Sequence, residues 1–231
     1  MVEADRFIAE FGIRRGVTAL IGGGGKTSLL LALADWLRPH GSVIVTTSTH
    51  IYPPDGLPYF DALPRPLEPG ECVAVGTLES NGKLSSPHPS FETLCRLADY
   101  VLCEADGSRG LPLKAHAAYE PVIPPGCETV LAVLGLDGVG RTIRDAAHRP
   151  ERYAAGLGVS EDAVVTPVLA AKMLRTYKDV NGFVLNKADD ASRITTAREI
   201  AALLPQPVAI TALQPNRKIL EIRRNGICLL S

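Results

Sequence analysis

Eight short apolar runs recur along the chain, and each is continuous rather than alternating. A continuous run needs cover on both faces of its strand, which is typical of a central, largely parallel sheet between helices. The predicted strands are 17–21, 43–45, 72–75, 100–103, 130–134, 183–185, 208–210 and 227–230. With helices between several of them, they predict an α/β fold with a doubly wound, mostly parallel sheet flanked by helices.

Helix signals fall between several of these runs. Residues 26–37 carry apolar side chains at helical spacing and end before Pro39. The other predicted helices are 1–11, a segment that Thr166 and Pro167 open and that runs to about Arg175, and a segment that Ser192 caps and that runs to Leu204.

Two segments interrupt the alternation of strands and helices. Ser80-Asn81-Gly82 predicts a hairpin turn, so part of 70–85 is expected to be antiparallel. The six prolines and two glycines of Tyr52–Gly70 predict an irregular surface excursion. We interpret residues 1–231 as a single domain that contains this excursion near 52–70.

Charge and cysteine content narrow the partners that we expect. Basic and acidic residues number 24 and 25, so no broad basic surface for a nucleic acid is expected. The five cysteines include no C-x-x-C pair, which favours a reducing, cytoplasmic setting. The longest apolar stretch, 29–34, is too short to span a bilayer. We therefore expect a soluble, cytoplasmic protein with neither a nucleic-acid nor a membrane partner.

The segment from Val17 to Leu30 has the order strand, glycine loop, helix start. Such a loop lets backbone N–H groups approach a phosphate, and the helix N-terminus adds a favourable dipole. Lys26 is then expected to bridge the β- and γ-phosphates, and the Thr27 hydroxyl to ligate Mg²⁺. The predicted nucleotide-binding residues here are Gly22, Gly23, Gly24, Gly25, Lys26, Thr27 and Ser28. The match is the shorter G-x-x-G-K-T form of this phosphate loop, or P-loop, because Leu20 stands where the full pattern has glycine.

The strand at 100–103 leads directly into Glu104 and Asp106. A carboxylate at this position of a phosphate-binding protein commonly completes the metal site, so both residues are candidate metal ligands and catalytic residues. Arg109 follows them closely and is a candidate for stabilising charge on a transferring phosphoryl group. An exposed basic loop is the alternative interpretation of Arg109.

After the strand at 183–185 comes Asn186-Lys187-Ala188-Asp189, an N-K-x-D pattern. The carboxylate of Asp189 can accept hydrogen bonds from N1–H and the 2-amino group of guanine, which adenine cannot offer. Ala212, in a Thr-Ala-Leu tripeptide at the end of the next strand, resembles the loop whose N–H meets guanine O6 in GTPases. Asn186, Lys187, Asp189 and Ala212 therefore favour GTP over ATP.

Several further polar residues are substrate or switch candidates. Thr46, Thr47, Thr49 and His50 follow the second strand, where a switch or substrate loop commonly lies. Lys114 is a candidate contact for an anion, and so is His148 together with Arg149, for which a helix start is the alternative interpretation. Cys103 is the thiol next to Glu104, and a buried, unreactive cysteine is the favoured interpretation over a role in selenium or sulfur transfer.

Six motifs together resemble the YqeC family across nearly the whole chain. They are Gly22–Thr27, Thr46–Pro54, Glu104–Lys114, Glu120–Pro124, His148–Pro150 and Asn186–Asp189. That family is named as an accessory protein of selenium-dependent molybdenum hydroxylases. The resemblance implies a P-loop nucleoside triphosphatase and a molybdenum hydroxylase or cofactor-maturation protein as partner.

These observations support three functions. The first is a slow Mg-dependent GTPase or ATPase that assists maturation of such a hydroxylase or its cofactor. The second is a small-molecule kinase with the same P-loop, and the third is a nucleotide-gated cofactor or metal chaperone with negligible turnover.

Overall fold

The computed structural model describes residues 3–230, which are built around one ten-stranded sheet. Its strands are β1 (Gly16–Gly22), β2 (Val43–Thr47), β4 (Tyr59–Phe60), β5 (Cys72–Val75), β8 (Tyr100–Glu104), β10 (Cys127–Gly135), β12 (Gly182–Asn186), β13 (Val208–Ala212), β14 (Lys218–Arg224) and β15 (Ile227–Leu230). They lie in the order β15-β14-β13-β12-β10-β1-β8-β2-β5-β4. Neighbours from β13 to β4 are parallel, and β14 and β15 add an antiparallel edge.

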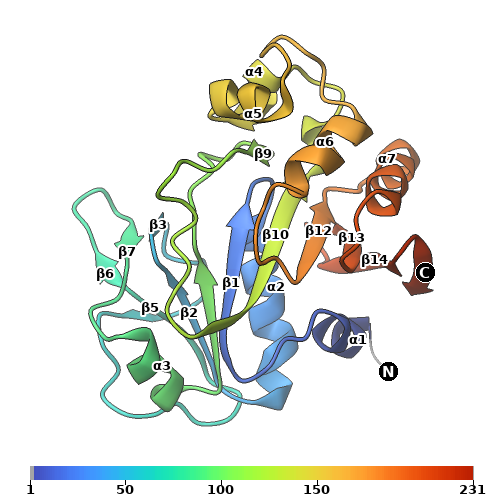
Figure 1. Cartoon of the computed structure of the whole chain (residues 1–231). Helices are drawn as coiled ribbons and strands as arrows, with labels where there is room; N and C mark the ends of the chain where they lie inside the picture. The colour runs from blue at the N-terminus through green and yellow to red at the C-terminus, as the bar shows by residue number, and fades with distance from the viewer. Residues whose placement is uncertain (1–2, 231) are drawn as a thin grey trace.

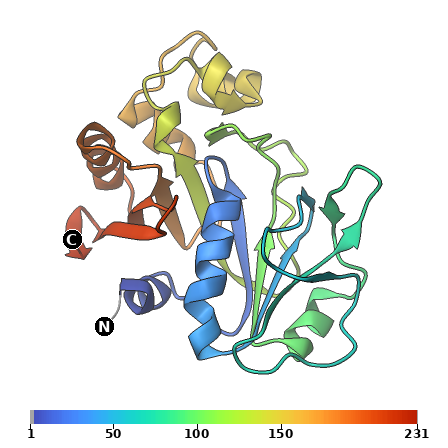
Figure 2. The same cartoon turned by 180° about the vertical axis from the view of Figure 1, so that it is seen from behind.

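Helices cover both faces of this sheet (Figure 1). They are α1 (Glu3–Glu10), α2 (Lys26–Leu37), α3 (Phe91–Leu97), α4 (Ile143–Ala146), α5 (Pro150–Leu157), α6 (Pro167–Leu174) and α7 (Ala191–Ala202), with 3-10 turns η1 (Arg38–His40) and η2 (Leu136–Gly138). α1 and α2 pack on the face seen in Figure 2, where Phe7 and Leu33 join the core. α3, α5, α6 and α7 contribute to the cores on the other face.

All eight predicted apolar runs form strands, and the α/β class with a mostly parallel sheet is confirmed. The predicted helices at 26–37 and after Thr166 are confirmed as α2 and α6. The predicted cap of α7 is wrong, because Asp190 and not Ser192 accepts the capping hydrogen bond, from Arg193 N–H. Of the predicted N-terminal helix, 3–10 is helical, and residues 1 and 2 lie outside the described residues.

The two interruptions are also visible in the structure. The predicted hairpin joins β6 (Thr77–Leu78) to β7 (Leu84–Ser85), which pairs in turn with β3 (His50–Ile51). The proline-rich excursion is irregular except for β4, which adds to the edge of the main sheet. In the described part of the chain, no helix has the length and apolar character needed to cross a membrane.

The carboxyl ends of the parallel strands gather at one edge of the sheet, at the top of β1 in Figure 1. The sheet order changes direction at β1, because β8, β2 and β5 lie on one side of it and β10, β12 and β13 on the other. Ligands of open parallel sheets bind outside the carboxyl ends at such a switch point. The glycine loop leaves β1 at this position.

Candidate functional site

The four glycines after β1 lie where a side chain cannot fit. A Cβ built on any of Gly22 to Gly25 would approach a neighbouring atom to between 2.2 and 2.6 Å. Those neighbours are the ends of β10 and β12 and the segment 111–112. Gly22, Gly24 and Gly25 also have φ angles of 98°, 74° and 128°, which disfavour other residues. Packing and backbone conformation therefore both account for the glycine run.

Four consecutive backbone N–H groups, from Gly25 to Ser28, donate to no acceptor among residues 3–230. They form the start of α2, which follows a glycine and so has no capping side chain, whereas Ser90, Thr142, Thr166 and Asp190 cap α3, α4, α6 and α7. Unpaired N–H groups at a helix N-terminus form an anion-binding site.

The expectation that Gly23 and Gly24 also direct N–H groups at the phosphate is wrong. Gly23 N–H donates to Val133 O at 2.9 Å, and Gly24 N–H donates to Leu111 O at 3.1 Å. The physical reason is that the loop continues the pairing with β10 and is covered by the segment after β8. The unpaired N–H groups of the loop therefore begin at Gly25.

Lys26 lies across the loop and is almost fully buried. Its ammonium donates to Gly22 O at 2.8 Å and lies 3.1 Å from Asp106 Oδ1 and 3.5 Å from Glu104 Oε1. Burial alone would lower the pKa of Lys26, but the two carboxylates raise it, so this lysine is charged. The arrangement keeps a cation beside the free N–H groups.

Glu104 and Asp106, the two acids predicted at the end of β8, differ in what they contact. Thr27 Oγ1 donates to Glu104 Oε2 at 2.9 Å, and burial raises the pKa of Glu104. Asp106 is fully buried and accepts from Gly22 N–H at 2.8 Å. Burial alone would raise the pKa of Asp106, but Lys26 and its other partners lower it. Glu104 lines the open pocket beside the loop, so Glu104 is better placed than Asp106 as a metal ligand.

Thr27 and Glu104 fit a Mg²⁺ ion bound together with a phosphate. Mg²⁺ takes oxygen ligands, commonly from one or two protein side chains, with substrate phosphates and water completing the set. A hydroxyl and a carboxylate in mutual contact at the start of α2 supply two such oxygens. The residues present therefore match the predicted Mg-nucleotide.

Asn186 joins the predicted base-recognition motif to the glycine loop. Its Nδ2 donates to Gly24 O at 3.0 Å, while its Oδ1 accepts from Thr211 Oγ1 and from Leu213 N–H, both at 3.2 Å. Asn186 is buried, so these bonds hold the loop, β12 and the end of β13 together. The structure thus brings the N-K-x-D and Thr-Ala-Leu segments side by side.

The other members of this group lie nearer the surface. Lys187 Nζ is 2.7 Å from Asp137 Oδ2. Asp189 is exposed, and its Oδ2 lies 3.1 Å from Arg193 Nη1. Ala212 ends β13 and is half-buried. Lys187 lines the pocket at the loop.

The pocket beside the glycine loop has a volume of about 800 Å³. Its lining includes Gly24 to Ser28, Thr49 to Asp55, Lys83, Glu104, Gly107 to Gly110, Glu120, His148, Arg149 and Lys187. Of the substrate or switch candidates, Thr49, His50 and His148 line it. Thr46 and Thr47 are buried and donate to Val75 O and Glu104 O, so they hold backbone in place. Lys114 is buried behind the pocket wall.

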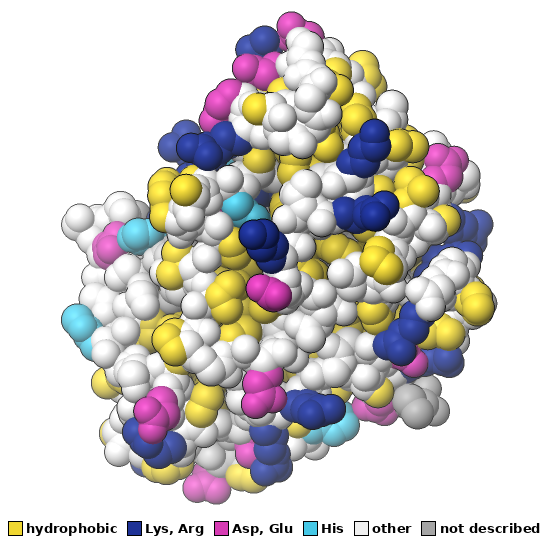
Figure 3. Space-filling view, in the orientation of Figure 1, with side chains coloured by type: hydrophobic (Ala, Val, Ile, Leu, Met, Phe, Trp, Pro, Cys, Tyr) yellow, Lys and Arg dark blue, Asp and Glu magenta, His cyan; other side chains and the backbone are white. Residues whose placement is uncertain are grey.

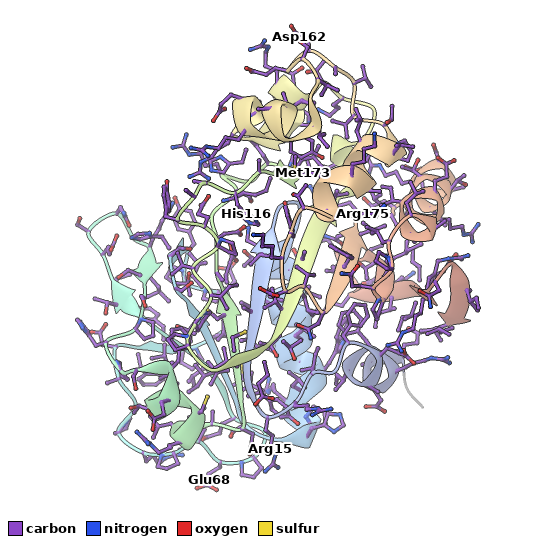
Figure 4. The ribbon with its side chains drawn as sticks, in the orientation of Figure 1. Arg15, Glu68, His116, Asp162, Met173 and Arg175 are labelled. Atoms are coloured by element: carbon purple, nitrogen blue, oxygen red, sulfur yellow. The ribbon has the colours of Figure 1, made fainter. Side chains whose placement is uncertain are left out.

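Three further residues extend the charged network around this pocket, and of these Glu120 and Arg149 line it. His116, which is labelled in Figure 4, has its Nε2 2.7 Å from Asp106 Oδ2, and its ring packs on Tyr177. Glu120 pairs with Lys114 at 2.8 Å and with Arg149. In the sequence, Glu120 stood out only as a member of a family motif, Arg149 stood out beside His148 as a candidate anion contact, and His116 had no signal of its own.

Cys103 lies in β8, fully buried. Burial raises the pKa of its thiol well above the ordinary value, so the sulfur is not held as a thiolate. The structure agrees with the interpretation of Cys103 as a buried apolar residue.

Comparison with known proteins identifies the family. A family model described as YqeC protein matches residues 18–151. An uncharacterized protein named YqeC from Escherichia coli (strain K12) is 31% identical over 185 residues, covering 71% of this chain and 70% of that relative. The matched region includes the glycine loop, Glu104 and the residues from Arg109 to Arg149. On this sequence similarity, the chain belongs to the YqeC family.

Proposed function

We propose that the chain binds a Mg-nucleoside triphosphate at the start of α2 and hydrolyses it slowly. The observation that carries the proposal is the set of four unpaired N–H groups from Gly25 to Ser28 beside the charged Lys26. Every helix leaves its first N–H groups without helical partners, but these four also have no side-chain cap and lie beside a buried ammonium, which favours an anion as their acceptor.

The residues around the loop have separate roles in this proposal. The N–H groups and Lys26 bind the β- and γ-phosphates, and Thr27 with Glu104 holds the metal. Mg²⁺ supplies charge neutralisation on the phosphate oxygens. Arg109 lines the pocket and would approach the transferring phosphoryl group. Both oxygens of Glu104 are engaged, one by Lys26 and one by Thr27, so neither is free to take a proton from an attacking water, and we therefore propose slow turnover.

Guanine is the base that the site favours. Asn186 ties the base-recognition segment to the loop, and the exposed Asp189 carboxylate, which is paired with Arg193, would exchange this partner for the base. In the family context, the proposed role is a cytoplasmic accessory factor in maturation of selenium-dependent molybdenum hydroxylases. Loss of hydroxylase activity after deletion of the gene, restored by the wild-type chain but not by a Thr27→Ala variant, would support this role; unchanged activity would overturn it.

A test of the metal-phosphate site is Thr27→Ala. Thr27 is exposed, so the variant should fold normally while losing one metal ligand. We expect Mg-dependent nucleotide affinity to fall by about tenfold or more, equivalent to roughly 1.4 kcal/mol. Titration with labelled GTP and ATP, with and without Mg²⁺, measures it.

Thr195→Ala is the matched control, because Thr195 is an exposed helical threonine far along the chain in α7. It should leave affinity unchanged. Equal affinity of wild type and Thr27→Ala in the presence of Mg²⁺ would contradict the assigned metal site.

Asp189→Asn tests base recognition. An amide cannot accept both hydrogen bonds that guanine donates, so GTP affinity should fall and xanthosine triphosphate affinity should rise. A competition assay with the three triphosphates measures the change. Asp190→Asn, which keeps the α7 cap, is the control. An unaltered order of preference in Asp189→Asn would exclude this carboxylate from base recognition.

A further inference from the structure

The pocket at the glycine loop is lined by a second group of residues besides the N–H groups that we propose bind phosphate. We call this group the second wall. This wall carries Arg109, His148 and Arg149, which come from two loops distant in sequence. The short parallel pair β9 (Leu113–Lys114) and β11 (Ala147–His148) joins those loops, with His148 opposite Lys114. The wall is therefore built into the fold and does not depend on two independent surface loops.

The wall carries more positive than negative charge. Glu120 is shared by Lys114 and Arg149, so one carboxylate faces two cations. Arg109 is exposed and has no ion-pair partner among residues 3–230. The whole pocket lining holds Lys26, Lys83, Arg109, Arg149 and Lys187 against Asp55, Glu104 and Glu120. Lys26 and Lys187 are already paired with Asp106 and Asp137 outside this lining, so Arg109 is the cation of the wall that an entering anion meets without an ion-pair partner among residues 3–230.

Both arginines have a backbone conformation that arginine rarely adopts. Arg109 has a φ of 52° and Arg149 a φ of 63°. A residue other than glycine held in the left-handed region is strained, and such residues cluster at ligand sites. Arg149 is further fixed by Tyr119, whose hydroxyl accepts from Arg149 Nη2 at 3.0 Å. The guanidinium of Arg149 is thus held in position before any ligand arrives.

The cations of this wall affect the protonation of His148. Burial lowers the pKa of His148, and Lys114, Arg149 and Arg109 lower it further. The imidazole is therefore neutral at pH 7 and can donate one hydrogen bond without adding charge.

We propose that Arg109, His148 and Arg149 bind the anionic group, phosphate or carboxylate, of a second small molecule. This inference rests on the proposed function, because it places that molecule beside the terminal phosphate of the bound nucleotide. In the proposed function, the nucleotide phosphates bind the N–H groups of Gly25 to Ser28 and Lys26, which line the same pocket as this wall. Arginine suits this role because its planar donors match both phosphate and carboxylate.

The test follows the imidazole signal of His148 by NMR while orthophosphate is added. The protein is first saturated with Mg²⁺ and a non-hydrolysable triphosphate analogue, so that the glycine loop is occupied. Orthophosphate at the wall should raise the pKa of His148 in a saturable manner. Arg149→Gln should weaken this response by at least about tenfold. Arg144→Gln, a surface arginine paired with Glu161 and Asp162, should leave it unchanged.

Arg149 contacts the buried Glu120, so Arg109→Gln serves as a second variant whose folding is not at issue. It should weaken the response as well. Citrate in place of orthophosphate separates a carboxylated from a phosphorylated ligand. A silent His148 with both anions, or a response as strong as that of the wild type in both Arg149→Gln and Arg109→Gln, would overturn the anion site.

Nucleotide binding, measured on the same samples, distinguishes failure of the proposed function from failure of the anion site. Absence of analogue binding would overturn the proposed function. Analogue binding together with a silent His148 would overturn the anion site alone.

Discussion

The buried contact between Lys26 and the two acids of β8 is the interaction on which the rest of the site depends. Taking an ammonium and two carboxylates out of water is costly unless each is paired and hydrogen-bonded. Here Lys26 meets Asp106 and Glu104, and Asp106 in turn accepts from the Gly22 N–H and contacts His116. These contacts join β1, α2, β8 and the segment after it. A phosphate that draws Lys26 toward itself would therefore be felt at Asp106 and His116.

The charge network that His116 and Glu120 complete lies between two hollows of the molecule. On one side lies the pocket at the glycine loop, and on the other lies a cavity of about 880 Å³ that His116, Glu120 and Tyr177 help to line. Away from this interior, Lys and Arg side chains on the face shown in Figure 3 are interspersed with Asp and Glu. A network of buried charged groups thus lies at the carboxyl edge of the sheet, where we propose that the protein binds anions.

Local patterns in the sequence predicted the strands, α2 and the glycine loop, because burial on both faces and glycine-only backbone leave direct marks on composition. β14 was missed, since its exposed ends and half-buried pattern lack a continuous apolar run. Which residues of the site contact one another could not be predicted in the same way. Thr27 and Glu104 are 77 positions apart, and Gly22 and Asp106 are 84 apart. His116 becomes meaningful only once the fold has placed it against Asp106.

Hydrogen exchange of the loop amides, resolved by NMR, tests the central claim most directly. The amides from Gly25 to Ser28 donate to no acceptor within residues 3–230, whereas those of Gly23 and Gly24 are already bonded to Val133 O and Leu111 O. Adding a Mg-triphosphate analogue should slow exchange at all four unpaired amides and change Gly23 and Gly24 little. Unaltered exchange from Gly25 to Ser28 under saturating analogue would contradict a phosphate site at the start of α2.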